Sequence, residues 1–178
     1  MIRRAVAVFG SSRTPSPSPE WSVAEDVGRR LAASGISVVT GGYGGTMEAV
    51  SKGASEGGGH VVGVIAPKLF PDRTGANPYV DELIEARDLL DRIGKLIDRA
   101  DGVIALPGSI GTAAELMIAW NHNYLRRHNG LPILPTVVVG PDWKALVENM
   151  IEVAGAEPGD VRAEDQPQDA VAWILQSV

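Results

Sequence analysis

Short apolar runs alternate along the chain with longer segments in which apolar residues recur every three or four positions. Runs such as "AVAVF" and "HVVGVIA" are rich in β-branched residues and too short for typical helices, so they predict strands. Such runs occupy residues 5–10, 36–40, 60–66, 82–86, 102–108 and 133–140. Helical patterns occupy about residues 20–34, 45–57, 88–100, 111–127, 142–154 and 167–177. Ser18, in the proline-rich loop before the first of these helices, is a candidate cap.

This alternation predicts an α/β fold. Strands that alternate with helices form βαβ units, whose strands lie parallel in one sheet. Because several of the runs are almost entirely apolar, we expect helices to cover both faces of the sheet. No linker, repeat or low-complexity tract divides the chain, so residues 1–178 are expected to form one domain around a doubly wound, mostly parallel sheet.

Composition and charge narrow the classes of function. The 178 residues carry a formal net charge of −6, which argues against nucleic acid or a membrane as partner, because both attract basic surfaces. A small anion remains a suitable ligand, since local backbone dipoles can bind it on an acidic protein. The chain has no cysteine and its histidines lack metal-ligand spacing, so no metal is expected. The lack of a signal-peptide core, or of an apolar span of about 18 residues, favours the cytoplasm.

Glycine-rich loops follow the first two predicted strands. Ligands of open α/β sheets bind outside the carboxyl ends of the strands, so a site is expected at these loops. The first loop contains Gly10, Ser11 and Ser12, and the second, "TGGYGGTMEA", contains Gly41, Gly42, Gly44, Gly45 and Thr46. The second loop matches neither the dinucleotide fingerprint nor a P-loop. An ordinary crowded turn is the alternative, but four glycines exceed what a turn needs, and the helix that follows suits a phosphate.

The stretch "LPGSIGTAAE" after the fifth predicted strand has the same character. It contains Pro107, Gly108, Ser109, Ile110, Gly111 and Thr112, followed by Glu115. The amides of such a turn, at the start of a helix, can hold an anion with the carboxylate of Glu115 beside it. Thr112-x-x-Glu115 also matches a capping box, in which Glu115 would bond the backbone of Thr112 instead. The sequence leaves both roles open.

Several segments, in order along the chain, resemble the Lonely Guy family, the cytokinin-activating phosphoribohydrolases. "PGSIGTAAE" differs by one residue from the family motif PGGxGTxxE, and "GGYGGTMEA" is similar to the family's GGGxGxMEA-type loop. The turn Gly10-Ser11-Ser12 and the segment "EGGGHVVGVIAPKLFP" at residues 56–71 also resemble the family. Arg92 stands nine residues ahead of Asp101, at the place of a family arginine. The resemblance covers about residues 1–150 and rests on motifs that occur in the family's order.

The resemblance implies a modified Rossmann fold, a homodimer, and cleavage of the N-glycosidic bond of a nucleoside 5′-monophosphate such as AMP or an N6-modified relative. It implies that Glu115 and Arg92 are catalytic and that the three loops hold the nucleotide without any cofactor. Glu48 would bond loop amides or ribose hydroxyls, with a simple surface glutamate as the alternative. For Arg92 the alternative is a helix-surface pair with Asp88, four residues earlier.

Two departures from the family pattern keep a second function open. Ser109 replaces the second glycine of PGG, and Ile93 replaces the lysine of the family's Arg-Lys pair. The helix beyond Glu115 resembles the family loosely, and Trp120 on it is expected in the core. A nucleotide-binding or cofactor-carrier protein without turnover is therefore the alternative function. Residues 69–79 form a long loop, of a length typical of lids and binding segments.

Overall fold

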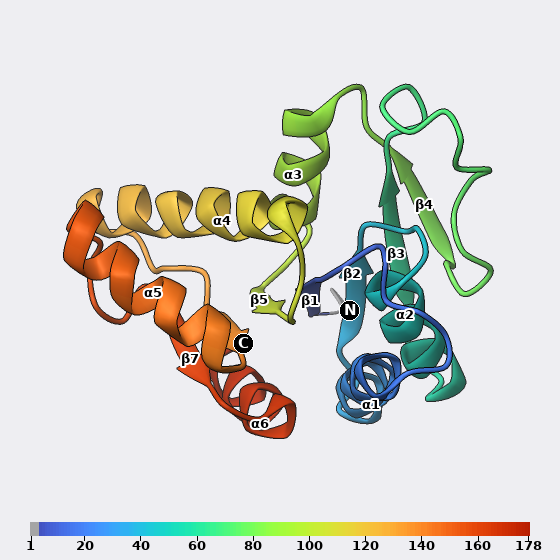
Figure 1. Ribbon diagram of the computed structural model, residues 1–178, viewed down its shortest axis with the longest axis horizontal. Helices are drawn as coiled ribbons and strands as arrows, with labels where there is room; N and C mark the ends of the chain where they lie inside the picture. Colours follow the sequence, from blue (N-terminus) through green and yellow to red (C-terminus); the bar gives the residue numbers. More distant parts are fainter. Residues whose placement is uncertain (1–3) are drawn as a thin grey trace.

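The computed structural model describes residues 4–178, in which seven strands form one sheet (Figure 1). The strands are β1 Ala5–Phe9, β2 Ser37–Thr40, β3 Val61–Ile65, β4 Glu82–Glu85, β5 Gly102–Ala105, β6 Thr136–Val139 and β7 Arg162–Glu164. They lie in the order β4-β3-β2-β1-β5-β6-β7, and every pairing among the described residues is parallel. The predicted doubly wound α/β fold is confirmed.

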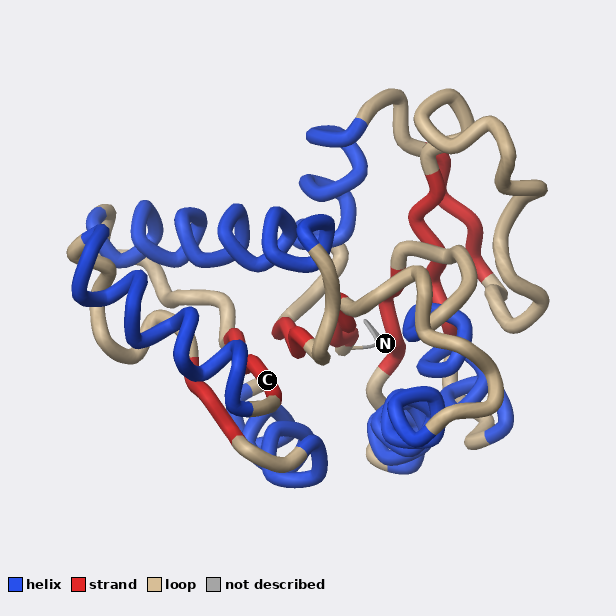
Figure 2. Tube along the Cα trace, viewed as in Figure 1, coloured by secondary structure: helices blue, strands red, loops and turns tan. Residues whose placement is uncertain are grey.

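Helices cover both faces of this sheet, as Figures 1 and 2 show. One face carries α1 Pro19–Ala33, α2 Thr46–Glu56 and α6 Pro167–Ser177. The other face carries α3 Leu89–Asp98, α4 Ile110–His128 and α5 Pro141–Ala154. Within residues 4–178, no helix is both long enough and apolar enough to cross a membrane. Figure 2 also shows the long loop between β3 and β4, which contains no helix or strand.

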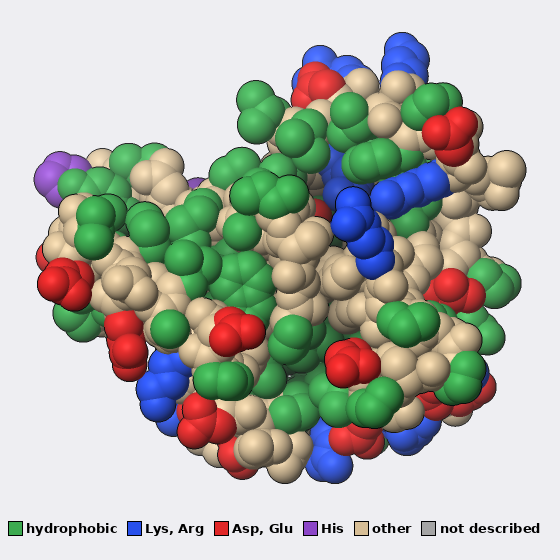
Figure 3. All heavy atoms as spheres, in the orientation of Figure 1, with side chains coloured by type: hydrophobic (Ala, Val, Ile, Leu, Met, Phe, Trp, Pro, Cys, Tyr) green, Lys and Arg blue, Asp and Glu red, His purple; other side chains and the backbone are tan. Residues whose placement is uncertain are grey.

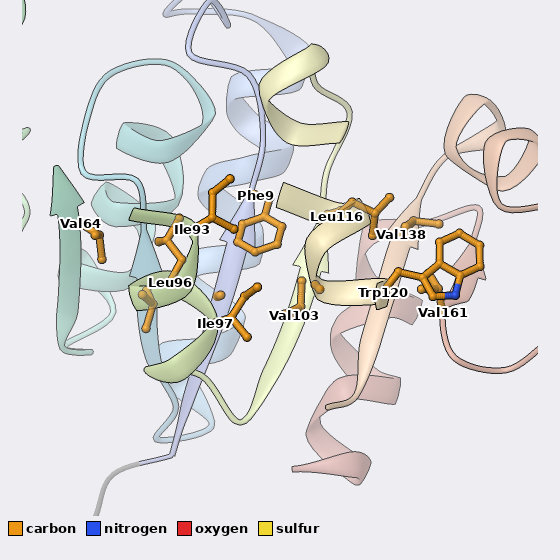
Figure 4. Packing of buried hydrophobic residues seen from close by; sticks show 14 of the residues in the cluster. Phe9, Val64, Ile93, Leu96, Ile97, Val103, Leu116, Trp120, Val138 and Val161 are labelled. Atoms are coloured by element: carbon orange, nitrogen blue, oxygen red, sulfur yellow. The ribbon is translucent and has the colours of Figure 1, made fainter. Parts of the chain in front are cut away.

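Alternate residues of the central strand β1 pack into the two layers of the core, one on each face of the sheet. Phe9 belongs to the cluster that includes residues of α3, α4 and α5, while Val8 belongs to the cluster with α1, α2 and α6. Figure 4 shows Phe9 next to Ile93 of α3, with Leu116 of α4 on its other side. Full burial of an apolar side chain of this size contributes about 1.5–3 kcal/mol. Ile93, where the family has a lysine, is therefore a core residue that holds α3 against the sheet.

Side-chain caps fix where two of the helices begin. Ser18 Oγ accepts a hydrogen bond from the Trp21 amide at 3.0 Å, which confirms the cap expected for α1. Asp88 caps α3 in the same way and accepts from the Asp91 amide at 2.9 Å. Arg92, one turn later, lies on the buried face of α3 together with Ile93 and Leu96.

Two strands at one side of the sheet differ from the prediction made from the apolar pattern. The edge strand β7 has three residues, Arg162–Glu164, two of them charged, so it carries no periodic apolar signal. β6 begins at Thr136, later than expected, because Pro132 and Pro135 ahead of it lack the N–H that a central strand needs.

The strand order creates a crevice outside the carboxyl ends of β1 and β5. The chain runs outward from β1 to β4 and then returns with β5 on the other side of β1. The loops after β1 and β5 therefore lead to α1 and α4, which lie on opposite faces of the sheet. Ligands of open α/β sheets bind at such a point, where the strand order reverses. The loop after β2 joins them, since the Thr46 amide donates to the Ser11 carbonyl at 2.8 Å.

Candidate active site

Arg92 reaches the crevice from α3 and is almost fully buried. Its Nε donates to the Val64 carbonyl of β3 at 2.9 Å, and its Nη2 donates to the Gly41 carbonyl at 3.0 Å. The residue is 5% exposed, so it is not part of a helix-surface pair. The Asp88 carboxylate caps α3 instead. The sheet and the loop after β2 therefore hold the guanidinium in one position.

Gly41 makes this position possible. A Cβ atom built on Gly41 would overlap Arg92 Nη2 and would lie 2.5 Å from Met47 Sδ. The glycine at this point of the loop is thus required for the close approach of the arginine to the backbone. Gly41 thus supports the site through Arg92, and the direct nucleotide contact implied by the resemblance stays a prediction.

Glu115 reaches the same point from α4. Its Oε1 accepts from Arg92 Nη1 at 3.3 Å, and the two side chains are 12% and 6% exposed. The capping box does not form, because α4 begins at Ile110 behind Ser109, and Thr112 already lies within the first turn. The carboxylate is therefore free of a capping role and faces the crevice as half of a buried ion pair.

Burial dominates the electrostatics of this pair. It raises the pKa of Glu115 to about 7, although the Arg92 guanidinium acts in the opposite direction. Burial also lowers the pKa of Arg92, and the nearby carboxylate opposes that change. A carboxyl that titrates near neutrality beside a fixed cation is typical of catalytic sites.

The N-terminus of α4 forms another wall of the crevice. Ser109 has φ −113° and ψ −168°, an ordinary extended conformation, so serine in place of the motif glycine causes no backbone strain. Its side chain makes no capping hydrogen bond. A Cβ on Gly108 would overlap Thr112 Oγ1, and this hydroxyl is buried without a hydrogen-bond partner among residues 4–178. The free amides and the unpartnered hydroxyl suit an anionic oxygen group.

These walls enclose a pocket of about 150 Å³. It is lined by Gly10, Ser12, Met47, Phe70, Arg73, Arg92, Ser109, Gly111, Thr112 and Glu115. A hollow of about 270 Å³ at Met117, Trp120 and Tyr124 is larger, but the site is assigned to the smaller pocket because it contains the buried ion pair. Figure 3 shows Lys and Arg side chains gathered beside the N-terminal end of α4.

Other residues expected at the site lie around this pocket. Several glycines and neighbouring residues of the loops are outside its lining: Ser11, Gly41, Gly42, Gly44, Gly45, Thr46, Pro107, Gly108 and Ile110. Pro107 and Thr46 line a separate hollow beside α1, and the Ile110 side chain is 86% exposed. Glu48 lies in a neighbouring hollow with Gly44 and Asn77. For these residues a direct nucleotide contact stays a prediction.

Three pocket residues were not singled out by the sequence. Phe70 and Arg73 come from the loop between β3 and β4, whose length indicated a binding segment without identifying these side chains. Met47 is buried, at 7% exposed, and its sulfur lies 3.8 Å from Arg92 Nη2. Trp120 is a core residue, as expected.

Known proteins share both the sequence and the fold. The SLOG cluster4 family matches residues 3–125. The cytokinin riboside 5′-monophosphate phosphoribohydrolase of Mycobacterium marinum is 38% identical over 142 residues, which are 79% of this chain and 72% of that protein. The protein of the same name from Mycobacterium tuberculosis is 37% identical over 137 residues, 76% of this chain and 70% of its own.

Solved structures extend the likeness to nearly the whole chain. The X-ray structure of a structural-genomics target is 28% identical, with a TM-score of 0.73 over 97% of this chain and 99% of that one. The molybdenum cofactor binding protein of Rippkaea orientalis has a TM-score of 0.77 over 98% and 96% of the two chains, but at 22% identity it shows the shared fold alone. The chain therefore belongs to the SLOG cluster4 family and, with its mycobacterial relatives, to the Lonely Guy family.

Proposed function

We propose that this protein is a nucleoside 5′-monophosphate phosphoribohydrolase, which uses water to release a free base and ribose 5-phosphate. The observation that carries the proposal is the buried pair of Arg92 and Glu115 in a pocket bounded by the N-terminus of α4. The protein is an enzyme, as are its mycobacterial relatives at 38% and 37% identity. The proposal treats the whole chain, residues 1–178, as one catalytic domain.

The start of α4 is suited to the 5′-phosphate. Backbone amides there have no partner within the helix, and the helix dipole places partial positive charge at the same point. Ser109 and Thr112 add hydroxyls that line the pocket. A phosphate held there is proposed to bring the ribose toward Glu115, one turn further along α4.

The reaction breaks the bond between C1′ and the base nitrogen, and the bonding electrons leave with the base. Positive charge develops at C1′ in an oxocarbenium-like transition state, which the Glu115 carboxylate stabilises. The oxygen of water bonds to C1′, while Glu115 orients the water and accepts its proton. The departing base takes up a proton, and ribose 5-phosphate remains.

Arg92 has one donor left for the substrate. Three of its five N–H groups donate to Val64, Gly41 and Glu115, and a fourth, on Nη2, faces Met47 Sδ. The remaining N–H is on Nη1, beside Glu115. It is proposed to bond a ribose hydroxyl or the departing base, so that the charge on the guanidinium assists departure.

The test is to incubate the protein with a panel of nucleoside monophosphates and to follow free base by chromatography. Base should appear with at least one nucleotide. Glu115→Gln keeps the size of the side chain but not its charge, so base release should fall by about 10²–10⁴-fold, the usual contribution of a general base. Nucleotide affinity by calorimetry should persist in this variant. Nucleotide binding without base from any member of the panel would instead support the carrier alternative.

The finer features of this function are also proposals. AMP or an N6-modified AMP is the proposed substrate, because the mycobacterial relatives carry the name of a cytokinin riboside 5′-monophosphate hydrolase. The cytoplasm, where nucleoside monophosphates are made and used, is the proposed location. Turnover of AMP against its N6-substituted forms and against other nucleoside monophosphates would test the preference for the base.

A homodimer is proposed through the outer face of α4. Ile118 and Leu125, two helical turns apart and hence on one face, are 36% and 49% exposed. An apolar stripe of this kind is suited to a second copy of the helix. Ile118→Glu should shift sedimentation from dimer to monomer, whereas Val153→Glu, at an 83% exposed position on α5, should not. A monomeric wild type would contradict the proposal.

A further inference from the structure

Arg73 is held over the pocket by two aromatic rings. Its guanidinium carbon lies 4.2 Å from the ring centroid of Phe70 and 4.6 Å from that of Tyr43. The rings meet edge to face at 5.5 Å with an angle of 76° between their planes. A guanidinium at this distance from aromatic faces is attracted by them, so Arg73 has a defined position although it lies on a loop.

Both ends of this loop are tied to the glycine-rich loop after β2. The hydroxyl of Tyr43 accepts from the Ala66 amide at 2.9 Å. At the other end, Asn77 Nδ2 donates to the carbonyls of Gly42 and Tyr43, both at 3.1 Å. The segment between these anchors therefore spans the pocket, with Arg73 in its middle.

The charge of Arg73 is not balanced by a carboxylate. In the part of the chain that the structure describes, the Arg73 guanidinium makes no ion pair, and its one side-chain hydrogen bond goes to Ser12 Oγ at 3.4 Å. Arg92 on the opposite wall is paired with Glu115. Arg73 and Arg92 both line this pocket, and the charge of Arg73 adds to the lowering of the Arg92 pKa, of which burial is the largest cause. The pocket thus holds more positive than negative charge.

A second observation points to an anion in this space. Thr112, on the wall formed by α4, is 2% exposed, and its Oγ1 has no hydrogen-bond partner among residues 4–178. A buried hydroxyl without a partner is costly, so its presence in the lining of a pocket indicates a ligand oxygen. Thr112 and Arg73 line the same pocket from different elements.

We propose that Arg73 binds the 5′-phosphate of the substrate, which it holds against the amides and hydroxyls at the start of α4. This assignment rests on the proposed function and adds a binding residue outside the motif loops. A guanidinium offers a planar set of donors that matches phosphate oxygens, and the aromatic seat keeps those donors oriented before the substrate arrives. Because the contact is the same in the ground and transition states, Arg73 should act on substrate binding rather than on the chemical step.

The test compares Arg73→Ala, Arg73→Lys and the control Lys68→Ala. Lys68 is an exposed cation on the same loop and lies outside the pocket lining. With a nucleoside monophosphate, Arg73→Ala should raise KM by about 10–100-fold, the effect of a lost charge-assisted hydrogen bond, while kcat changes by less than about threefold. Arg73→Lys should fall between, and Lys68→Ala should match the wild type.

Calorimetry with ribose 5-phosphate separates this inference from the proposed function. Wild type should bind this probe, and Arg73→Ala should weaken its binding by about the same 10–100-fold. Ribose, which lacks the phosphate, should not distinguish the two proteins. If wild type binds ribose 5-phosphate but releases no base, the proposed function fails and Arg73 is still tested. Equal ribose 5-phosphate affinities in wild type and Arg73→Ala would overturn the assignment.

Discussion

Arg92 Nη1 and Glu115 Oε1 lie 3.3 Å apart, although the residues come from different helices that pack on one face of the sheet. The guanidinium is further held by the carbonyls of Val64 and Gly41. Each charge has lost most of its hydration, so each depends on its partner. This interdependence determines how the site responds to pH and to changes in its supporting residues.

We expect kcat/KM to rise with pH through an ionisation near pH 7. Burial raises the pKa of Glu115 to about 7, so the carboxylate that assists water is fully formed only above neutrality. Arg92 opposes this rise, so Arg92→Gln should move the ionisation to higher pH. The phosphate of the substrate ionises near pH 6 in both proteins and should not move. If kcat/KM of the variant still rises at the same pH near 7, Glu115 is excluded as the ionising group.

The same pKa has a consequence for stability. The folded state holds the Glu115 proton more tightly than the unfolded chain, where the pKa is near 4.5. The contribution of Glu115 to the free energy of unfolding should therefore decrease as pH rises from about 4.5 to about 7. Glu115→Gln lacks the ionisation, so denaturant unfolding at pH 4.5 and pH 8 should show a smaller decline in the variant. Equal pH dependence in the two proteins would show that the carboxyl is not perturbed.

The supports of this pair were largely invisible in the sequence. Apolar alternation was sufficient to predict the strands around Phe9 and the covering helices, and Ser18 was recognisable as a cap. The spacing of Asp88 and Arg92 alone indicated a surface pair. The bonds of Arg92 to Val64 and Gly41 could not be predicted, because they join segments that meet only in the folded sheet.

The position of Arg73 is another tertiary effect. It depends on Tyr43 and Phe70, which lie in different loops and have no shared pattern in the sequence. The glycine-rich loops could be recognised in the sequence as a site, because their backbone amides are close together along the chain. The side chains of Phe70 and Arg73 could not, because they reach the pocket from the β3–β4 loop. The resemblance supplied Glu115 and Arg92, and the structure supplied the contact between them.

Gly41→Ala should strongly reduce activity without unfolding the protein. The added methyl group would overlap Arg92 Nη2, so the guanidinium must move away from Glu115. Displacement of a catalytic group by about 1 Å can cost on the order of 100-fold in rate, so base release should fall by at least that factor. Gly94→Ala, on α3 and outside the site, is the matched control, since an added Cβ there meets no atom within 4 Å. Full activity in Gly41→Ala would show that Arg92 does not need its present position.

Thr112→Val should stabilise the protein and weaken nucleotide binding. Thr112 Oγ1 is buried and has no partner within the described residues, so its removal eliminates a desolvation cost. Denaturant unfolding should show a gain of about 1 kcal/mol, while KM for the nucleotide should rise about tenfold. Thr112→Ser keeps the hydroxyl and should retain the affinity. A loss of stability in Thr112→Val would mean that the hydroxyl has a partner in the free protein.

Asn123→Ala should destabilise the fold without affecting catalysis. Asn123 is fully buried in α4, where its Nδ2 is shared among the Leu134 carbonyl at 2.8 Å, the Asp160 carbonyl at 3.1 Å and Thr136 Oγ1 at 3.2 Å. Its Oδ1 also accepts from the Leu134 amide at 2.8 Å. The side chain thus joins α4 to the segment that enters β6 and to the residues before β7, all outside the pocket lining.

Truncation at this position leaves several buried polar groups without partners, each at a cost of about 1–3 kcal/mol before relaxation. The free energy of unfolding should therefore fall by about 2–4 kcal/mol in a denaturant titration. Asn121→Ala, at an exposed position on the same helix, should change it by less than about 0.5 kcal/mol. Base release well below the melting temperature should match the wild type in both variants. A large loss of activity in folded Asn123→Ala would instead couple this buried network to the Arg92–Glu115 pair.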